Sequence, residues 1–239
     1  MKKVFITIVL FLAVIVSAQT KDPKKLIDAV RQKFNKVNDY KVDVSVKLDM
    51  SFVKVPDMKA KVYFKKPDKL KVEAEGFAML PKEGLKFSPA ELFKDTFTPL
   101  YVRTETISNK KLDVIKAIPN NDSSNIVITT LWIDAVDLVI RKVETTTRNG
   151  GTTQSELMYD NAEYGLPSQI KISFNLGNMQ VPANLPNQSN ETGDAKKDKK
   201  RRGMGEGVSI KGSVTMSYTN YQINKGVPDS IFEEKEKKK

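Results

Sequence analysis

Residues 58–75 alternate between apolar and polar side chains with a strict period of two, interrupted once by a proline turn. The apolar positions are Met58, Ala60, Val62 and Phe64 before the turn and Leu70, Val72 and Ala74 after it. A period of two is that of a β-strand with one buried face, and Pro67-Asp68 is common turn chemistry. We therefore predict a β-hairpin whose apolar face belongs to a larger sheet.

Lys66 comes directly before this turn, on the apolar side by parity. A long side chain at a strand end can extend its ammonium beyond the apolar surface. We therefore expect Lys66 to lie at the rim of whatever this face encloses. A solvated turn lysine is the alternative.

The same alternation continues along most of the chain. Residues 40–52 predict a strand of roughly 40 Å, at about 3.3 Å per residue, and a strand of that length has to twist and curve. Further strands are predicted at residues 100–107, 112–118, 125–134, 138–147, 153–159 and 168–176. A last strand begins at Val208 and changes parity near Asn220, which indicates a β-bulge. The predicted fold is mainly β (α+β): an incomplete, strongly curved antiparallel β-barrel.

Two short helices are available to close this barrel. Asp22-Pro23 begins the first as N-cap and first helical residue, and SPAE at residues 88–91 is similar to a capping box that begins the second. Residues 76–81 are apolar but bounded by breakers, and predict a flap that is either core filling or a mobile lid. We also expect a helix to cover Trp132, because residues 131–133 are apolar on both faces.

Two short helices cover only part of so long a concave face, so the sequence predicts an apolar cavity that binds acyl chains by area burial. A dry core filled by the same side chains is the alternative. The predicted cavity-lining residues are Val44, Val46, Leu48, Met50, Met58, Val62, Phe64, Leu70, Val72, Phe77, Met79, Leu80, Phe93 and Trp132, with Lys66 as the rim cation. No cofactor and no metal site are expected.

Residues 1–18 have the pattern of a secretory signal peptide: two lysines, an apolar run, and small residues before a cleavage expected after Ala18. Because the apolar run is too short to span a bilayer comfortably, we expect a released, soluble protein. Residues 19–239 are then one domain, with a disordered basic insertion at about 177–207 and a charged tail at 233–239.

The 239-residue chain contains no Cys and no His. This composition excludes Ser-His-Asp and Cys-His catalysis and the common zinc sites, and most acids fall on the wet faces of strands, so we expect no enzyme. The net charge of +11 is compatible with an anionic partner, but no basic helix with interleaved aromatics indicates nucleic acid. Residues 194–202 are either a solvated spacer or a segment that docks on an acidic partner or anionic headgroups.

Four sequence features follow one another along the chain, and their order and spacing are informative together. They are the signal peptide followed by the helix from Asp22, VYFKKPDKLKV at residues 62–72, LWID at residues 131–134, and YQINKGVPDSIF at residues 221–232. In these features the chain resembles the LolA-like family of periplasmic outer-membrane lipoprotein carriers. Family members have an arginine where this chain has Lys66, and a lysine keeps the charge but loses the planar, multi-donor group.

The resemblance implies a periplasmic monomer with a half β-barrel that carries lipoproteins. An inner-membrane lipoprotein-releasing transporter would supply the acyl chains, and an outer-membrane acceptor would receive them. The alternative is a lipid- or lipoprotein-sensing regulator or scaffold of the same fold, without transport activity. A second domain for partner binding would favour the alternative, and the sequence shows none.

Overall fold

The computed structural model describes residues 21–50, 53–54, 56–74, 96–148, 151–179 and 208–233. Its elements are helix α1 (Pro23–Phe34), strands β1 (Asp39–Met50), β2 (Val53–Lys54), β3 (Met58–Lys65), β4 (Lys69–Ala74), β5 (Phe97–Ile107), β6 (Lys110–Pro119), β7 (Ile126–Asp134), β8 (Val139–Thr147), β9 (Thr152–Met158), β10 (Gln169–Met179) and β11 (Val208–Ile223), and the 3-10 helix η1 (Asp229–Ile231). No helix in these ranges is long and apolar enough to cross a membrane. The predicted signal peptide, flap and second helix, most of the insertion and most of the charged tail lie outside the described residues.

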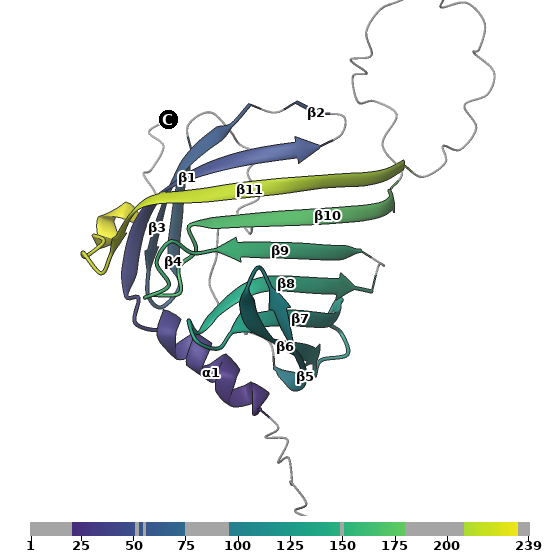
Figure 1. Ribbon diagram of the computed structural model, residues 1–239. Coiled ribbons are helices and arrows are strands. Elements are labelled where there is room, and N and C mark those ends of the chain that lie inside the picture. The colour runs from purple at the N-terminus through teal and green to yellow at the C-terminus, as the bar shows by residue number, and fades with distance from the viewer. Residues whose placement is uncertain are drawn as a thin grey trace, which may run out of the picture.

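The strands form one antiparallel sheet in the order β4-β3-β1-β11-β10-β9-β8-β7-β6-β5, and β2 pairs with β1. Over the part of the chain that the structure describes, β4 and β5 are the two edges and do not pair with each other, so the sheet is not closed. Figure 1 shows the strong curvature of this sheet, with α1 lying at one end of it. The predicted incomplete antiparallel barrel is confirmed.

The alternating segments form strands at nearly the predicted positions, because each segment has one apolar face to bury. The bulge predicted near Asn220 is present: Lys41 and Asp43 pair with Gln222 and Thr219, so β11 contains one extra residue there. Asn220 has a φ of 57°, a left-handed conformation that Asn tolerates better than most residues. Strand β10 continues to Met179, beyond the expected start of the insertion at residue 177.

The core lies between α1 and one face of the sheet, here termed the inner face. The Asp22 carboxylate caps α1 by accepting the backbone N–H groups of Lys24 and Lys25 at 3.0 and 3.2 Å. The helix buries Ile27, Val30 and Phe34 in this core. From the sheet, the buried core includes Val42, Val44, Val46, Val62, Leu131, Ile133, Ile170 and Met216.

A second, smaller cluster lies on the opposite face, here termed the outer face. Trp132 packs there with Leu112 and Val114, and its indole Nε1 donates to the Glu105 carboxylate at 3.2 Å. The ammonium of Lys142 lies 4.3 Å from the centre of the indole ring. The expectation that a helix covers Trp132 is therefore wrong for α1, which packs on the inner face; strand neighbours bury this side chain instead.

Candidate functional site

Three hydrogen bonds tie the C-terminal end of α1 to three separate turns, and they are here termed the α1 clamp. The bonds run from Lys33 Nζ to the Asp137 carbonyl, from Lys66 Nζ to the Asn35 carbonyl, and from Asn224 Nδ2 to the Lys36 carbonyl at 2.9 Å. The turns are those of the β3–β4 hairpin, the β7–β8 hairpin and the end of β11. Because β3 and β7 are far apart in the strand order, the clamp holds α1 across the open sheet.

Lys66 has a definite partner in this arrangement. Its half-buried side chain donates to the carbonyl of Asn35, the C-cap of α1, and its backbone N–H donates to the Asn38 carbonyl at 2.8 Å. A cation at a helix C-terminus also interacts favourably with the helix dipole. Lys66 therefore joins the β3–β4 turn to α1, while its expected place at the rim of a cavity stays a prediction.

Asn224 supports the clamp from the end of β11. Its side-chain Oδ1 accepts the backbone N–H of Asn38 at 2.7 Å while its Nδ2 donates to Lys36. Its φ of 55° places it in the left-handed region. The segment between α1 and β1 is thereby held by a residue that lies 186 positions away from Asn38 in sequence.

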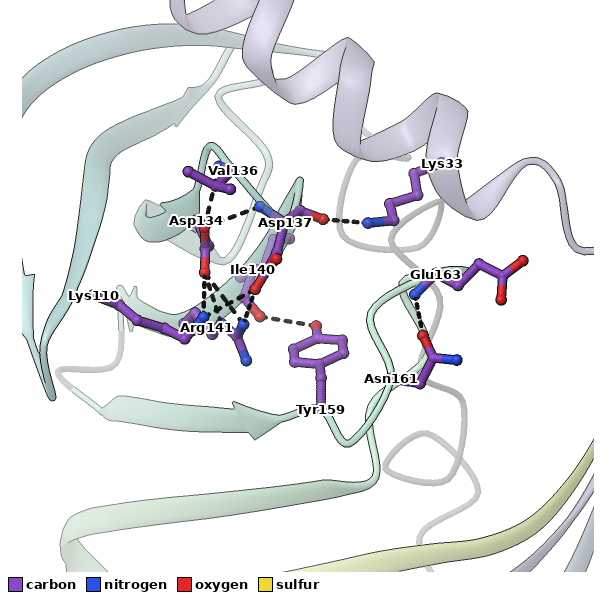
Figure 2. Close-up of polar contacts among 10 residues, drawn as sticks. All are labelled: Lys33, Lys110, Asp134, Val136, Asp137, Ile140, Arg141, Tyr159, Asn161 and Glu163. Atoms are coloured by element: carbon purple, nitrogen blue, oxygen red, sulfur yellow. Dashed lines mark hydrogen bonds and ion pairs between the residues drawn. The ribbon is translucent and has the colours of Figure 1, made fainter.

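The Lys33 contact is supported by an ion network beneath it, shown in Figure 2. The Asp134 carboxylate accepts backbone N–H groups from Val136 and Asp137, both at 3.1 Å, and receives Lys110 and Arg141 at 3.2 Å. Asp134 is only 3% exposed. Burial opposes its ionisation, but the hydrogen bonds from Asp137, Lys110 and Arg141 outweigh burial and lower its pKa to about 2.

Three further contacts complete this network. The Arg141 guanidinium bonds the Asp137 carboxylate at 2.6 Å and lies 5.0 Å from the centre of the Tyr159 ring, whose hydroxyl donates to the Ile140 carbonyl at 2.9 Å. On α1, burial lowers the pKa of Lys33, and the Asp137 charge partly offsets that effect. The β7–β8 turn is thus a rigid platform for one end of α1.

A second group of contacts holds the C-terminal segment on the β3–β4 hairpin. Asp229 pairs with Lys65 at 2.8 Å and with Lys69 at 2.7 Å, and Lys71 donates to the Ile231 carbonyl. Hydrogen bonds from the two lysines lower the pKa of Asp229 to about 2. Together with the clamp, these contacts show what three of the four sequence features do: the turns at KKPDK, directly after LWID and at NKGVPDSI position α1 or the hairpin beside it.

The inner face changes character with distance from α1. The row Val46, Met216, Ile170 and Leu157 is fully buried in the core. In the next two rows, Leu48, Val214, Ile172 and Phe174 are apolar but only half-buried. We term these four residues the distal apolar rows, because they lie one and two rows beyond the buried row on β1, β10 and β11. Figure 1 shows that these three strands extend away from α1.

The predicted cavity-lining residues separate into four groups. Val44, Val46, Val62 and Phe64 are buried in the core, whereas Leu48, Met58, Leu70 and Val72 are half-buried at its margin. Trp132 lies on the outer face and is not brought together with the others. Phe77, Met79, Leu80 and Phe93 lie outside the described residues, as does the side chain of Met50.

A pocket of about 740 Å³ lies over β1, β3, β4 and the bulge of β11. Its charged lining residues are Asp43, Lys59, Lys61 and Glu73, which belong to the outer face. Two members of the predicted cavity-lining set, Val44 and Val72, also line this pocket, but its charged side chains distinguish it from the apolar cavity that the sequence predicts. No group of three His, Cys, Asp or Glu side chains suited to a metal ion occurs among the residues with described positions.

No protein-family model and no curated protein matches the sequence. Solved structures do match. A LolA superfamily protein from Nitrosomonas europaea is 14% identical over 89% of this chain and 97% of its own, with a TM-score of 0.54. An outer membrane lipoprotein-sorting protein domain from Vibrio parahaemolyticus is 9% identical over 88% and 97%, with a TM-score of 0.53.

A DUF1329 family protein from Desulfovibrio piger is 11% identical over 89% of this chain and 98% of its own, with a TM-score of 0.56. Identities this low show a common fold and leave function to be argued from the site. The chain has the fold of LolA superfamily proteins.

Proposed function

We propose that this chain is a periplasmic carrier that binds the acyl chains of lipids or lipoproteins on its distal apolar rows. The observation that carries the proposal is the half-buried state of Leu48, Ile172, Phe174 and Val214 on the concave inner face. Burial of each CH₂ group is worth about 0.8 kcal/mol, so ten methylenes on this surface give roughly 8 kcal/mol before the ordering terms of binding are subtracted.

Opening of the α1 clamp would uncover the buried core row of Val46, Met216 and Ile170, which adjoins the distal apolar rows and would extend the apolar surface open to cargo. Two of the clamp's three bonds come from the flexible, partly exposed side chains of Lys33 and Lys66, and each such bond contributes only about 1 kcal/mol. The clamp is therefore weak enough to open while the buried ion network around Asp134 stays intact. We expect loading to involve movement of the C-terminal end of α1 away from the β3–β4 turn.

Two features support a lipid cargo. The distal apolar rows contain no charged side chain, and one relative with the same fold is described as a lipoprotein-sorting domain. Under this proposal Leu48, Met58, Leu70 and Val72 contact cargo first, because their side chains are the half-buried members of the predicted set. An inner-membrane lipoprotein-releasing transporter and an outer-membrane acceptor are the proposed partners.

The test is to purify the exported chain from a Gram-negative periplasm without detergent and to identify co-purifying molecules by native and then denaturing mass spectrometry. Acylated peptides or lipids are the expected result. Fluorescent fatty-acid titration then compares Ile172→Asn with Lys171→Asn, which changes the neighbouring residue on the outer face of β10. We expect a loss of affinity of about tenfold or more for Ile172→Asn only.

Circular dichroism of both variants controls for misfolding. A protein that purifies empty and takes up no fluorescent fatty acid would overturn the lipid-binding proposal. That result would leave a regulator or scaffold that binds a protein.

A further inference from the structure

Four hydroxyl side chains form a patch on the inner face of β7, β8 and β9. Thr129 pairs with Thr145, and Thr145 pairs with Thr153, so three threonines lie in one row across three strands. Ser155 lies on β9 in the adjoining row. We term these residues, all of them half-buried, the hydroxyl patch.

The hydroxyl patch continues directly from the distal apolar rows. Thr153 pairs with Phe174 and Ser155 pairs with Ile172 across the β9–β10 ladder. The inner face beyond the core is therefore apolar on β1, β10 and β11 and hydroxyl-bearing on β7, β8 and β9. A ligand that fits both parts has an apolar portion and a hydrogen-bonding portion side by side.

The hydroxyls retain capacity to bind a ligand. Thr129 Oγ1 and Thr145 Oγ1 are 3.4 Å apart, which is long for a bond between hydroxyls. The side-chain hydroxyls of Thr153 and Ser155 have no hydrogen-bond partner among the residues that the structure describes. Each hydroxyl has one donor and two acceptor positions, and covering it with a bare hydrocarbon chain would be unfavourable.

Among the described residues, the strand neighbours of the patch on the inner face are uncharged. Its inner-face neighbours in the ladders include Ala117, Val143, Ile172 and Phe174. The charged residues of β8 and β9, among them Lys142, Glu144 and Glu156, pair with one another or with outer-face residues. The patch therefore suits neutral acceptors such as carbonyl groups, and the strands described around it place no cation there to receive a phosphate.

We infer that the hydroxyl patch binds the ester or amide carbonyls that join the acyl chains of a lipid to its head, while the chains lie on the distal apolar rows. This inference rests on the proposed function, because it assigns the polar end of the same ligand. Ester-linked acyl groups occur both on acylated proteins and in glycerides, and amide-linked acyl groups occur on acylated proteins. Both sources share the carbonyl chemistry that the patch recognises.

The probes are 1-palmitoylglycerol and 1-O-hexadecylglycerol, which share chain length and head but differ in the carbonyl. Each displaces a bound fluorescent fatty acid from the full chain. We expect the ester to bind about tenfold more tightly than the ether, the effect of one or two hydrogen bonds. The variant Thr145→Val/Thr153→Val should bind both probes equally.

The matched control is Thr146→Val/Thr152→Val, a directly paired set on the same two strands but on the outer face, which should keep the preference. Thermal unfolding verifies that both variants fold. Equal binding of ester and ether to the unsubstituted chain overturns the inference and leaves the proposed function intact, whereas failure of every probe to bind overturns both. Mass spectrometry of co-purified cargo distinguishes acylated peptides from glycerides.

Discussion

Replacing Asp134 by Asn tests the ion network that supports α1. The carboxylate is 3% exposed, and its pKa is lowered from 3.8 to about 2. At 1.36 kcal/mol per pKa unit, ionised Asp134 contributes about 2.5 kcal/mol to folding at pH 7. In the Asp134→Asn variant, Arg141 and Lys110 still pair with the Asp137 carboxylate, at 2.6 and 3.0 Å. The larger cost of leaving a buried cation without a partner is therefore not added. The expected loss in Tm is about 5–10 °C for a chain of this size.

The pH dependence of this loss has a defined sign. A carboxyl whose pKa is lower in the folded state stabilises that state above its unfolded pKa, and the effect disappears as the pH falls through its folded pKa. The difference between Asp134→Asn and the unsubstituted chain should therefore narrow from about 2.5 kcal/mol at pH 7 to about 1 kcal/mol at pH 2.5.

Urea unfolding followed by the fluorescence of Trp132, the single tryptophan, measures this difference at both pH values. Asp43→Asn is the control, because Asp43 makes a half-exposed pair with Lys61 at 3.9 Å, and such a pair contributes at most about 1 kcal/mol. Equal stability of Asp134→Asn and the unsubstituted chain at pH 7 would refute the reasoning, as would a difference that does not change with pH.

Three further substitutions test the clamp and the inner face. Lys66→Ala should lower the free energy of unfolding by no more than about 1 kcal/mol yet speed the exchange of bound fluorescent fatty acid. Lys66→Arg can still donate to the Asn35 carbonyl and should keep exchange slow. Identical exchange rates in both variants and the unsubstituted chain would count against the clamp. Asn224→Ala removes bonds on both sides of the α1–β1 connection and strains a residue at φ 55°, so urea unfolding should show a loss of about 2 kcal/mol. Gly212→Ala places a Cβ 2.8 Å from Phe174 Cζ, so the Phe174 ring has to move. We therefore expect thermal unfolding to show a loss of stability of about 1–3 kcal/mol, together with weaker fatty-acid binding. Unchanged stability and unchanged binding would show that the site relaxes freely.

The strands could be predicted from sequence because their periodicity is a local property. β8, predicted at residues 138–147, is observed as Val139–Thr147. The bulge at Asn220 was also predictable, since an extra residue reverses the parity of every side chain after it. In both cases a single buried face determines the pattern.

The partners of individual side chains could not be predicted in this way. The bond from Lys66 to Asn35 requires a turn and a helix end to meet in space, and no local pattern encodes that meeting. Residues 131–133 are apolar on both faces, but the sequence does not say whether a helix or neighbouring strands bury Trp132. The hydroxyl patch depends on the register of β7, β8 and β9, which includes an irregularity between Trp132 and Ile133.

The position of β1 has a consequence for how the chain folds. β1 pairs with β11 over nearly its whole length, so this ladder inside the sheet joins residues about 170 positions apart. Contacts this distant form slowly, because the closure of a long loop precedes any gain from pairing. Until β11 is in place, β1 and β10 each present a long unpaired edge, and such edges template association with other chains. A chain interrupted before residue 208 therefore has two open edges, at β1 and β10, in addition to those at β4 and β5, and we expect it to aggregate.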